Sequence, residues 1–99
     1  MLATPLVAQG TVQAYLCDRQ VEVPVIYVAG PPAAVVLSVE GRLVYLESTP
    51  SASGARYAGT GHKSSYVWWS KGDAAMLAWF DAPSEEETPL YKQCTRNGR

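Results

Sequence analysis

Long apolar segments are missing from this chain of 99 residues. No run approaches the roughly 18 consecutive apolar residues that a membrane-spanning helix needs. Charge is also scarce, because only 17% of the residues are charged and the formal net charge is −1. The absence of a basic cluster disfavours nucleic acid or an anionic membrane surface as a partner. The length allows one domain and excludes a large cofactor-binding α/β enzyme.

Cysteine and histidine are also rare, with two residues and one residue respectively. The two cysteines, Cys17 and Cys94, lie near opposite ends of the chain, which fits one disulfide between an early element and the last one. In the chain-entropy model a bridge that closes so long a loop stabilises a domain by about 4–5 kcal/mol. Two unpaired cytosolic thiols are the alternative. A metal site is disfavoured, since His62 is the only histidine and no Cys-x-x-Cys spacing exists.

Residues 1–10 lack the basic start and the long apolar stretch of a signal peptide. We expect them to form a flexible N-terminal extension and residues 11–99 to form the folded domain. A disulfide would favour an oxidising compartment. We therefore expect the chain to be the mature part of an exported protein with an added Met1, with a cytosolic protein as the alternative.

Short apolar runs separated by turn residues make up most of the chain, and their Val, Tyr, Trp and Leu content favours strands. Glu40–Gly41 and Lys71–Gly72 lie at the spacing of tight hairpin loops. Many short strands predict an all-β sandwich or barrel, and a closed barrel has the advantage of removing sheet edges. The predicted strands are Thr11–Leu16, Val21–Val28, Ala34–Val39, Arg42–Glu47, Ser65–Ser70 and Ala74–Phe80, with Leu90–Cys94 as a weaker candidate.

Two polar segments, Ser48–Gly54 and Ala58–Ser64, interrupt the strand pattern, and Glu85–Glu87 predict an acidic, solvated loop before Pro89. The first segment contains small side chains that make a slim loop able to enter a narrow cleft. Its hydroxyl and backbone groups can replace the hydrogen bonds of a sugar. Lys71, at the tip of a predicted hairpin, would project outward.

The sequence gives little support for a catalytic function. Ser53, His62 and Asp73 or Asp81 supply the residue types of a hydrolase triad, but their spacing matches no known triad and there is no nucleophile elbow. The carboxyls of Glu85–Glu87 lie side by side, whereas acid–base catalysis needs two groups with separately tuned pKa values. We expect no enzymatic activity; a small hydrolase that uses Ser53 and His62 is the alternative.

Aromatic residues are more informative. Three Trp and six Tyr against one Phe form an amphipathic aromatic set of the kind enriched at interfaces. Trp68 and Trp69 are adjacent, so a strand would point them to opposite faces. One should enter the core and the other should reach the surface. A glycan-binding module with Trp68, Trp69 or Trp79 as a stacking platform is therefore one functional hypothesis.

Two segments resemble the signature motifs of the bacterial inhibitors of c-type lysozyme, the MliC/PliC family. They are SASGARY at 51–57 and YVWWSKGD at 66–73. Tyr15–Asp18 and Cys94 also resemble that family's Y-x-C-D motif and its C-terminal cysteine. The resemblance covers nearly the whole chain from about residue 11 onward. The order of the motifs between two matching cysteines makes the resemblance specific.

The resemblance implies an eight-stranded antiparallel β-barrel in the periplasm or at the outer membrane, without catalytic activity. We expect neither a cofactor nor a metal. It implies c-type lysozyme as the partner, with a loop serine and a hairpin lysine meeting the two catalytic carboxyl groups. The matching residues are Ser53 and Lys71, and Gly54, Arg56 and Tyr57 complete the predicted lysozyme-binding set. A homodimer is compatible with the sequence. The alternative function is a periplasmic glycan- or peptidoglycan-binding barrel without inhibitory activity.

Overall fold

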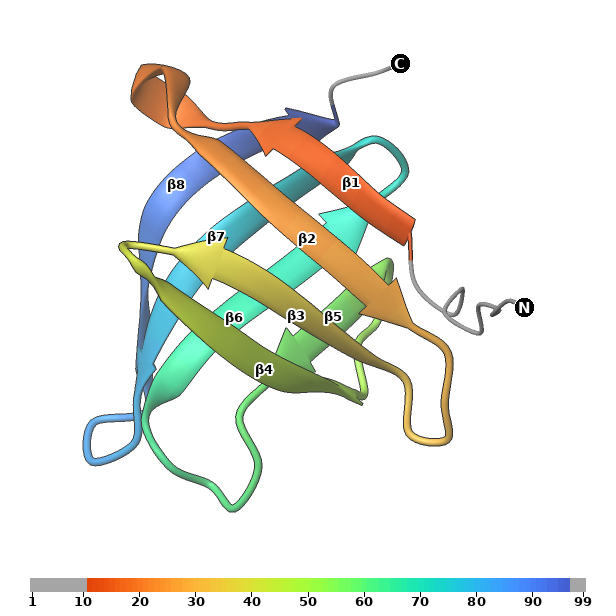
Figure 1. Ribbon diagram of the computed structural model, residues 1–99. Helices are drawn as coiled ribbons and strands as arrows, with labels where there is room; N and C mark the ends of the chain where they lie inside the picture. Colours follow the sequence, from red (N-terminus) through yellow and green to blue (C-terminus); the bar gives the residue numbers. More distant parts are fainter. Residues whose placement is uncertain (1–10, 97–99) are drawn as a thin grey trace.

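Eight antiparallel strands form a closed barrel in the computed structural model, which describes residues 11–96 (Figure 1). A short 3-10 turn, η2 (Asp18–Gln20), connects the first two strands. The N-terminal extension predicted for residues 1–10 lies outside the described residues. The strands are β1 (Thr11–Leu16), β2 (Glu22–Val28), β3 (Ala34–Val39), β4 (Arg42–Thr49), β5 (Ala55–Ala58), β6 (Ser65–Lys71), β7 (Ala74–Asp81) and β8 (Glu86–Arg96).

Each strand pairs with the next one along the chain, so the barrel has a simple up-and-down order. β1 also pairs with β8 through Tyr15–Arg96 and Leu16–Thr95, and these two positions close the barrel. Closure joins the first strand to the last, although only these two positions are paired across the seam. The prediction of an all-β, eight-stranded antiparallel barrel is confirmed.

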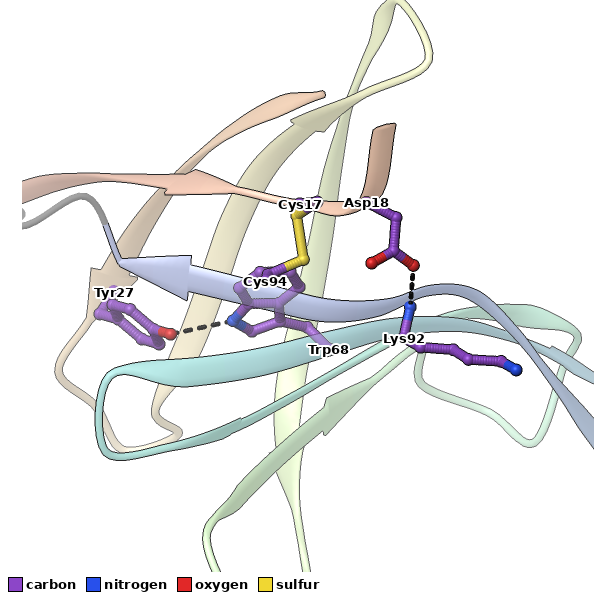
Figure 2. Close-up of a disulfide and its surroundings, with 6 residues drawn as sticks. All are labelled: Cys17, Asp18, Tyr27, Trp68, Lys92 and Cys94. Carbon is purple, nitrogen blue, oxygen red and sulfur yellow. Dashed lines mark hydrogen bonds between the residues drawn. A yellow bond between two sulfur atoms is a disulfide. The ribbon is translucent and has the colours of Figure 1, made fainter. Parts of the chain in front are cut away.

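The predicted disulfide lies on the closing seam. Cys17 directly follows β1 and Cys94 belongs to β8, and the two are joined 77 positions apart in sequence (Figure 2). Close by, the backbone N–H of Lys92 donates a hydrogen bond of 2.7 Å to the Asp18 carboxylate. One covalent bond and one hydrogen bond thus reinforce a seam with few paired positions.

Aromatic side chains fill the barrel interior. Trp68 is 0% exposed and packs edge-on against Tyr15, with ring centroids 5.0 Å apart. Its indole N–H donates to the Tyr27 hydroxyl at 2.9 Å, and that hydroxyl also hydrogen bonds to the Tyr15 hydroxyl at 2.9 Å. Every buried polar group of this cluster therefore has a partner. Trp69 lies on the outer face, so the predicted opposition of the two adjacent tryptophans is confirmed.

One strand was not predicted, and two local predictions were wrong. The segment between the two polar interruptions is the strand β5, which is held between β4 and β6 by ladder hydrogen bonds. The second hairpin turn is Gly72–Asp73 instead of Lys71–Gly72, because a II′ turn places its glycine first and Gly72 has φ +61°. Glu86 and Glu87 belong to β8, where pairing with β7 overrides their low strand propensity.

We expect reduction of the Cys17–Cys94 bridge to lower the free energy of unfolding by roughly 2–5 kcal/mol, because the bridge closes a long loop across a short seam. Urea unfolding followed by tryptophan fluorescence, with and without dithiothreitol, measures this difference. A Cys17→Ser/Cys94→Ser double variant is the control, since its unfolding should not respond to dithiothreitol. Equal midpoints for the oxidised and the reduced protein would show that the bridge does not hold the seam.

Candidate functional site

The barrel topology brings the two signature segments to the same end of the molecule. In an up-and-down barrel successive connections alternate between the two ends, and the β4–β5 loop and the β6–β7 hairpin are two connections apart. Both lie at the right-hand end of the barrel in Figure 1. We call the loop Ser51–Gly54 together with Arg56, Trp69 and Lys71 the loop–hairpin site.

Hydrogen bonds hold the loop in one shape. The Ser51 hydroxyl donates to the carbonyl oxygens of Ser53, at 2.8 Å, and Gly54, at 3.1 Å. The indole N–H of Trp69 donates to the same Ser53 carbonyl at 2.9 Å. The first two bonds close the turn and the third ties it to β6. The loop is thus exposed but attached to a rigid strand.

Gly54 allows the loop to touch the end of β6. Its φ is +69°, in the left-handed region that favours glycine. A Cβ atom at this position would lie 2.5 Å from the Ser70 carbonyl oxygen and 3.4 Å from Cβ of Lys71. Only a residue without a side chain fits such an approach. The backbone next to Ser53 therefore lies in contact with the strand that carries Lys71.

The side chain of Arg56 connects the site to β8 across the outer surface of the barrel. Its guanidinium lies 5.8 Å from the centroid of the Trp69 ring and forms an ion pair with Glu87. Because Arg56 is on β5 and Glu87 on β8, the pair spans the outer face of β6 and β7. Local sequence patterns do not reveal this contact, because the two residues lie 31 positions apart and Glu87 was predicted to lie in a solvated loop.

Lys71 presents a free ammonium group. Its side chain is exposed, and no salt bridge joins it to any other residue in the range 11–96. The neighbouring carboxylate of Asp73 is instead paired with Arg96. The hydroxyl of Ser53 likewise has no hydrogen-bond partner among the described residues. The site therefore offers one cation and one hydroxyl that are available to a ligand.

Tyr57, which the resemblance grouped with the binding residues, points into the barrel instead. It is 8% exposed and its ring lies 5.9 Å from that of Tyr27. Burial raises the pKa of its phenol above the usual value. Tyr57 thus supports β5 from inside, while Ser53, Gly54, Arg56 and Lys71 reach the surface site.

The alternative hydrolase is contradicted by the placement of its residues. His62 lies in the β5–β6 connection, at the end of the barrel opposite to Ser53, where its ring faces Phe80 and Glu85. A strand of seven residues separates the two ends by on the order of 20 Å. Ser53 and His62 therefore cannot exchange a proton.

The three tryptophans lie in different surroundings and do not share one exposed face. Trp68 is buried, Arg56 lies over the ring of Trp69, and Trp79 packs edge-on against Tyr66 at 5.1 Å between centroids. Residues 11–96 contain no group of three or more His, Cys, Asp or Glu side chains arranged for a metal ion. Within these residues, no helix is long and apolar enough to cross a membrane.

These features define a class: a small antiparallel β-barrel that presents a fixed polar loop and a free lysine from one end. The family model described as "Membrane-bound lysozyme-inhibitor of c-type lysozyme" (MliC) matches residues 15–86. The chain therefore belongs to this family.

Two relatives illustrate the similarity. A protein of Cupriavidus necator named "Membrane-bound lysozyme inhibitor of C-type lysozyme" is 42% identical over 64 residues, which are 64% of this chain and 48% of that protein. The chain thus spans about half the length of this curated relative. The crystal structure of PliC-St, a periplasmic lysozyme inhibitor of C-type lysozyme from Salmonella typhimurium, superposes with a TM-score of 0.72 and 25% identity, over 90% of this chain and 99% of that one.

We expect Trp69→Phe to loosen the loop while the barrel stays folded, because phenylalanine keeps an aromatic ring but removes the N–H that binds Ser53. Backbone ¹⁵N order parameters of residues 51–54 should fall from about 0.85 toward 0.6. The matched control is Trp79→Phe, which removes an indole N–H away from the loop and should leave these values unchanged. Unchanged order parameters in Trp69→Phe would mean that the bond does not fix the loop.

Proposed function

We propose that this protein inhibits c-type lysozyme by plugging the active cleft, with Ser53 and Lys71 placed against the two catalytic carboxyl groups. Family membership supports the choice of partner. The observation that carries the mechanism is the contact of Gly54 with the end of β6, which sets the Ser53 loop beside Lys71. A free hydroxyl and a free ammonium on one protruding edge match a cleft that contains two acids.

The chemistry of the cleft suits this pair. In a retaining glycosidase the two carboxyl groups lie about 5–5.5 Å apart, one kept protonated as the general acid and the other ionised. The ammonium of Lys71 complements the ionised carboxylate, and the hydroxyl of Ser53 can exchange a hydrogen bond with the protonated carboxyl. Hydrogen bonds to charged groups contribute about 1.5–3 kcal/mol each. Substrate is then excluded because the loop occupies its place.

The shape of the site favours a plug over an enclosed ligand pocket. The loop is slim, since Ser51, Ala52, Ser53 and Gly54 all have small side chains. Its internal hydrogen bonds and the bond to Trp69 exist before any partner binds. Little conformational entropy is therefore lost when it enters a cleft, which raises the affinity for a given set of contacts.

We further propose that this protein catalyses no reaction and that it lies in the periplasm or at the outer membrane. The disulfide between Cys17 and Cys94 supports an oxidising compartment. The names of the two relatives, one membrane-bound and one periplasmic, support the same region of the cell envelope.

We expect Lys71→Ala to weaken lysozyme binding by about 2–5 kcal/mol, because it leaves a carboxylate of the partner buried without its cation. Ser53→Ala should cost less, about 0.5–1.5 kcal/mol. Calorimetric titration gives the affinities, and lysis of bacterial cells by lysozyme gives the inhibition. Lys63→Ala is the matched control, since it removes an exposed lysine from the opposite end of the barrel. Full inhibition by a Ser53→Ala/Lys71→Ala double variant would rule out the plug.

A further inference from the structure

We propose that a groove on the outer face of β6, β7 and β8 is a second contact surface for the same lysozyme, and that it binds a carboxylate of the enzyme flanked by apolar side chains. The groove has a volume of about 390 Å³. This inference rests on the proposed function and extends its interface from the loop–hairpin site to β8. We call it the bulge groove; residues that line it include Trp69, Lys71, Ala74, Met76, Lys92 and Gln93.

A β-bulge shapes the groove. Ala75 pairs with Cys94 and Leu77 pairs with Tyr91, so only Met76 remains opposite the two β8 residues between them, Lys92 and Gln93. Such a bulge bends its strand and changes the direction of the side chains at that point. Both bulged residues line the groove.

The bulge is fixed by contacts with the connection between β1 and β2. The backbone N–H of Lys92 is held by the Asp18 carboxylate at 2.7 Å, and Cys94 is held by the disulfide to Cys17. Figure 2 shows the side chain of Lys92 extending away from both of these contacts. The backbone of the bulge is thus anchored while the ammonium group of Lys92 stays free to reach a ligand.

The lining of the groove selects the chemistry of its occupant. Lys71 and Lys92 contribute two positive charges, and none of the residues that line the groove is acidic. Two carboxylates of neighbouring segments are already engaged: Asp73 is paired with Arg96, and Asp18 accepts a hydrogen bond from the backbone N–H of Lys92. Between the lysines, Trp69 and Met76 form a cross-strand pair that supplies an apolar floor. A carboxylate next to apolar side chains complements this arrangement.

Continuity with the loop–hairpin site identifies the occupant as lysozyme. Lys71 and Trp69 belong to both surfaces, so an enzyme that covers the loop also covers the adjoining groove. When Lys71 turns toward the catalytic carboxylate, Lys92 remains as the cation of the groove. Met76 can adapt to the enzyme surface because its side chain is unbranched and flexible.

Titration of chicken egg-white lysozyme with Lys92→Ala and Lys92→Glu tests the groove. We expect Lys92→Ala to weaken binding about five- to tenfold and Lys92→Glu to weaken it further, because the contact is a partly desolvated ion pair. The dependence of log Kd on log salt concentration should also become less steep in Lys92→Ala. Both variants should keep the wild-type unfolding temperature, since the side chain is exposed and the bond to Asp18 uses the backbone.

The controls separate this inference from the proposed function. Lys63→Ala, which removes one charge at the other end of the barrel, should change Kd less than twofold if the effect of Lys92 is local. If wild-type protein binds and Lys71→Ala is impaired but both Lys92 variants bind normally, the groove is not a contact surface and the plug stands. If Lys63→Ala is as impaired as Lys92→Ala, attraction is general and the inference fails. If wild-type protein does not bind lysozyme, both proposals fail.

Discussion

The backbone contact between Gly54 and the end of β6 is the constraint on which the site depends. A side chain at position 54 would collide with the Ser70 carbonyl oxygen, so the loop can approach β6 only through glycine. The hydrogen bond from the Trp69 indole to the Ser53 carbonyl oxygen holds the loop in this position. Because these contacts involve backbone atoms and one rigid indole, Ser53 and Lys71 are presented together as a preorganised pair. Preorganisation reduces the conformational entropy that a loop loses when it binds a partner.

The rest of the barrel keeps that contact in place. The up-and-down order puts the β4–β5 loop and the β6–β7 hairpin at one end. The ion pair between Arg56 and Glu87 links β5 to β8 across the outer face of the intervening strands. The disulfide of Cys17 with Cys94 closes the short β1–β8 seam and, with Asp18, anchors the bulge that carries Lys92. Elements far apart in sequence therefore support a single edge of the molecule.

Local sequence patterns predicted much of this fold but not its long-range contacts. The long strands carry clear apolar runs, and Glu40–Gly41 forms the expected hairpin because both residues adopt positive φ. The strand β5 escaped prediction because its four residues place only one large apolar side chain, Tyr57, in the core. Its conformation comes from pairing with β4 and β6 instead of from its own composition. Glu87 was misassigned for a related reason, since its partner Arg56 is invisible to a local pattern.

The residues of the site were predicted from the resemblance of their motifs to a known family. Their arrangement in space could be described only from the structure of the barrel. Residue types alone could not place Ser53 beside Lys71, because that proximity follows from strand number, strand order and one glycine contact. The same topology separates Ser53 from His62, which contradicts the hypothesis of a hydrolase that uses these two residues. The bulge at Lys92 and Gln93 left no signal in the sequence, since it arises from the register between β7 and β8.

Competition with a chitin oligosaccharide that fills the lysozyme cleft tests occupation of that cleft most directly. The Kd of the protein for lysozyme would be measured at increasing oligosaccharide concentration. If the Ser53 loop and Lys71 occupy the catalytic site, the apparent Kd should rise in proportion to the oligosaccharide added once its own dissociation constant is exceeded. An apparent Kd that stays constant when the cleft is saturated with oligosaccharide would contradict this account.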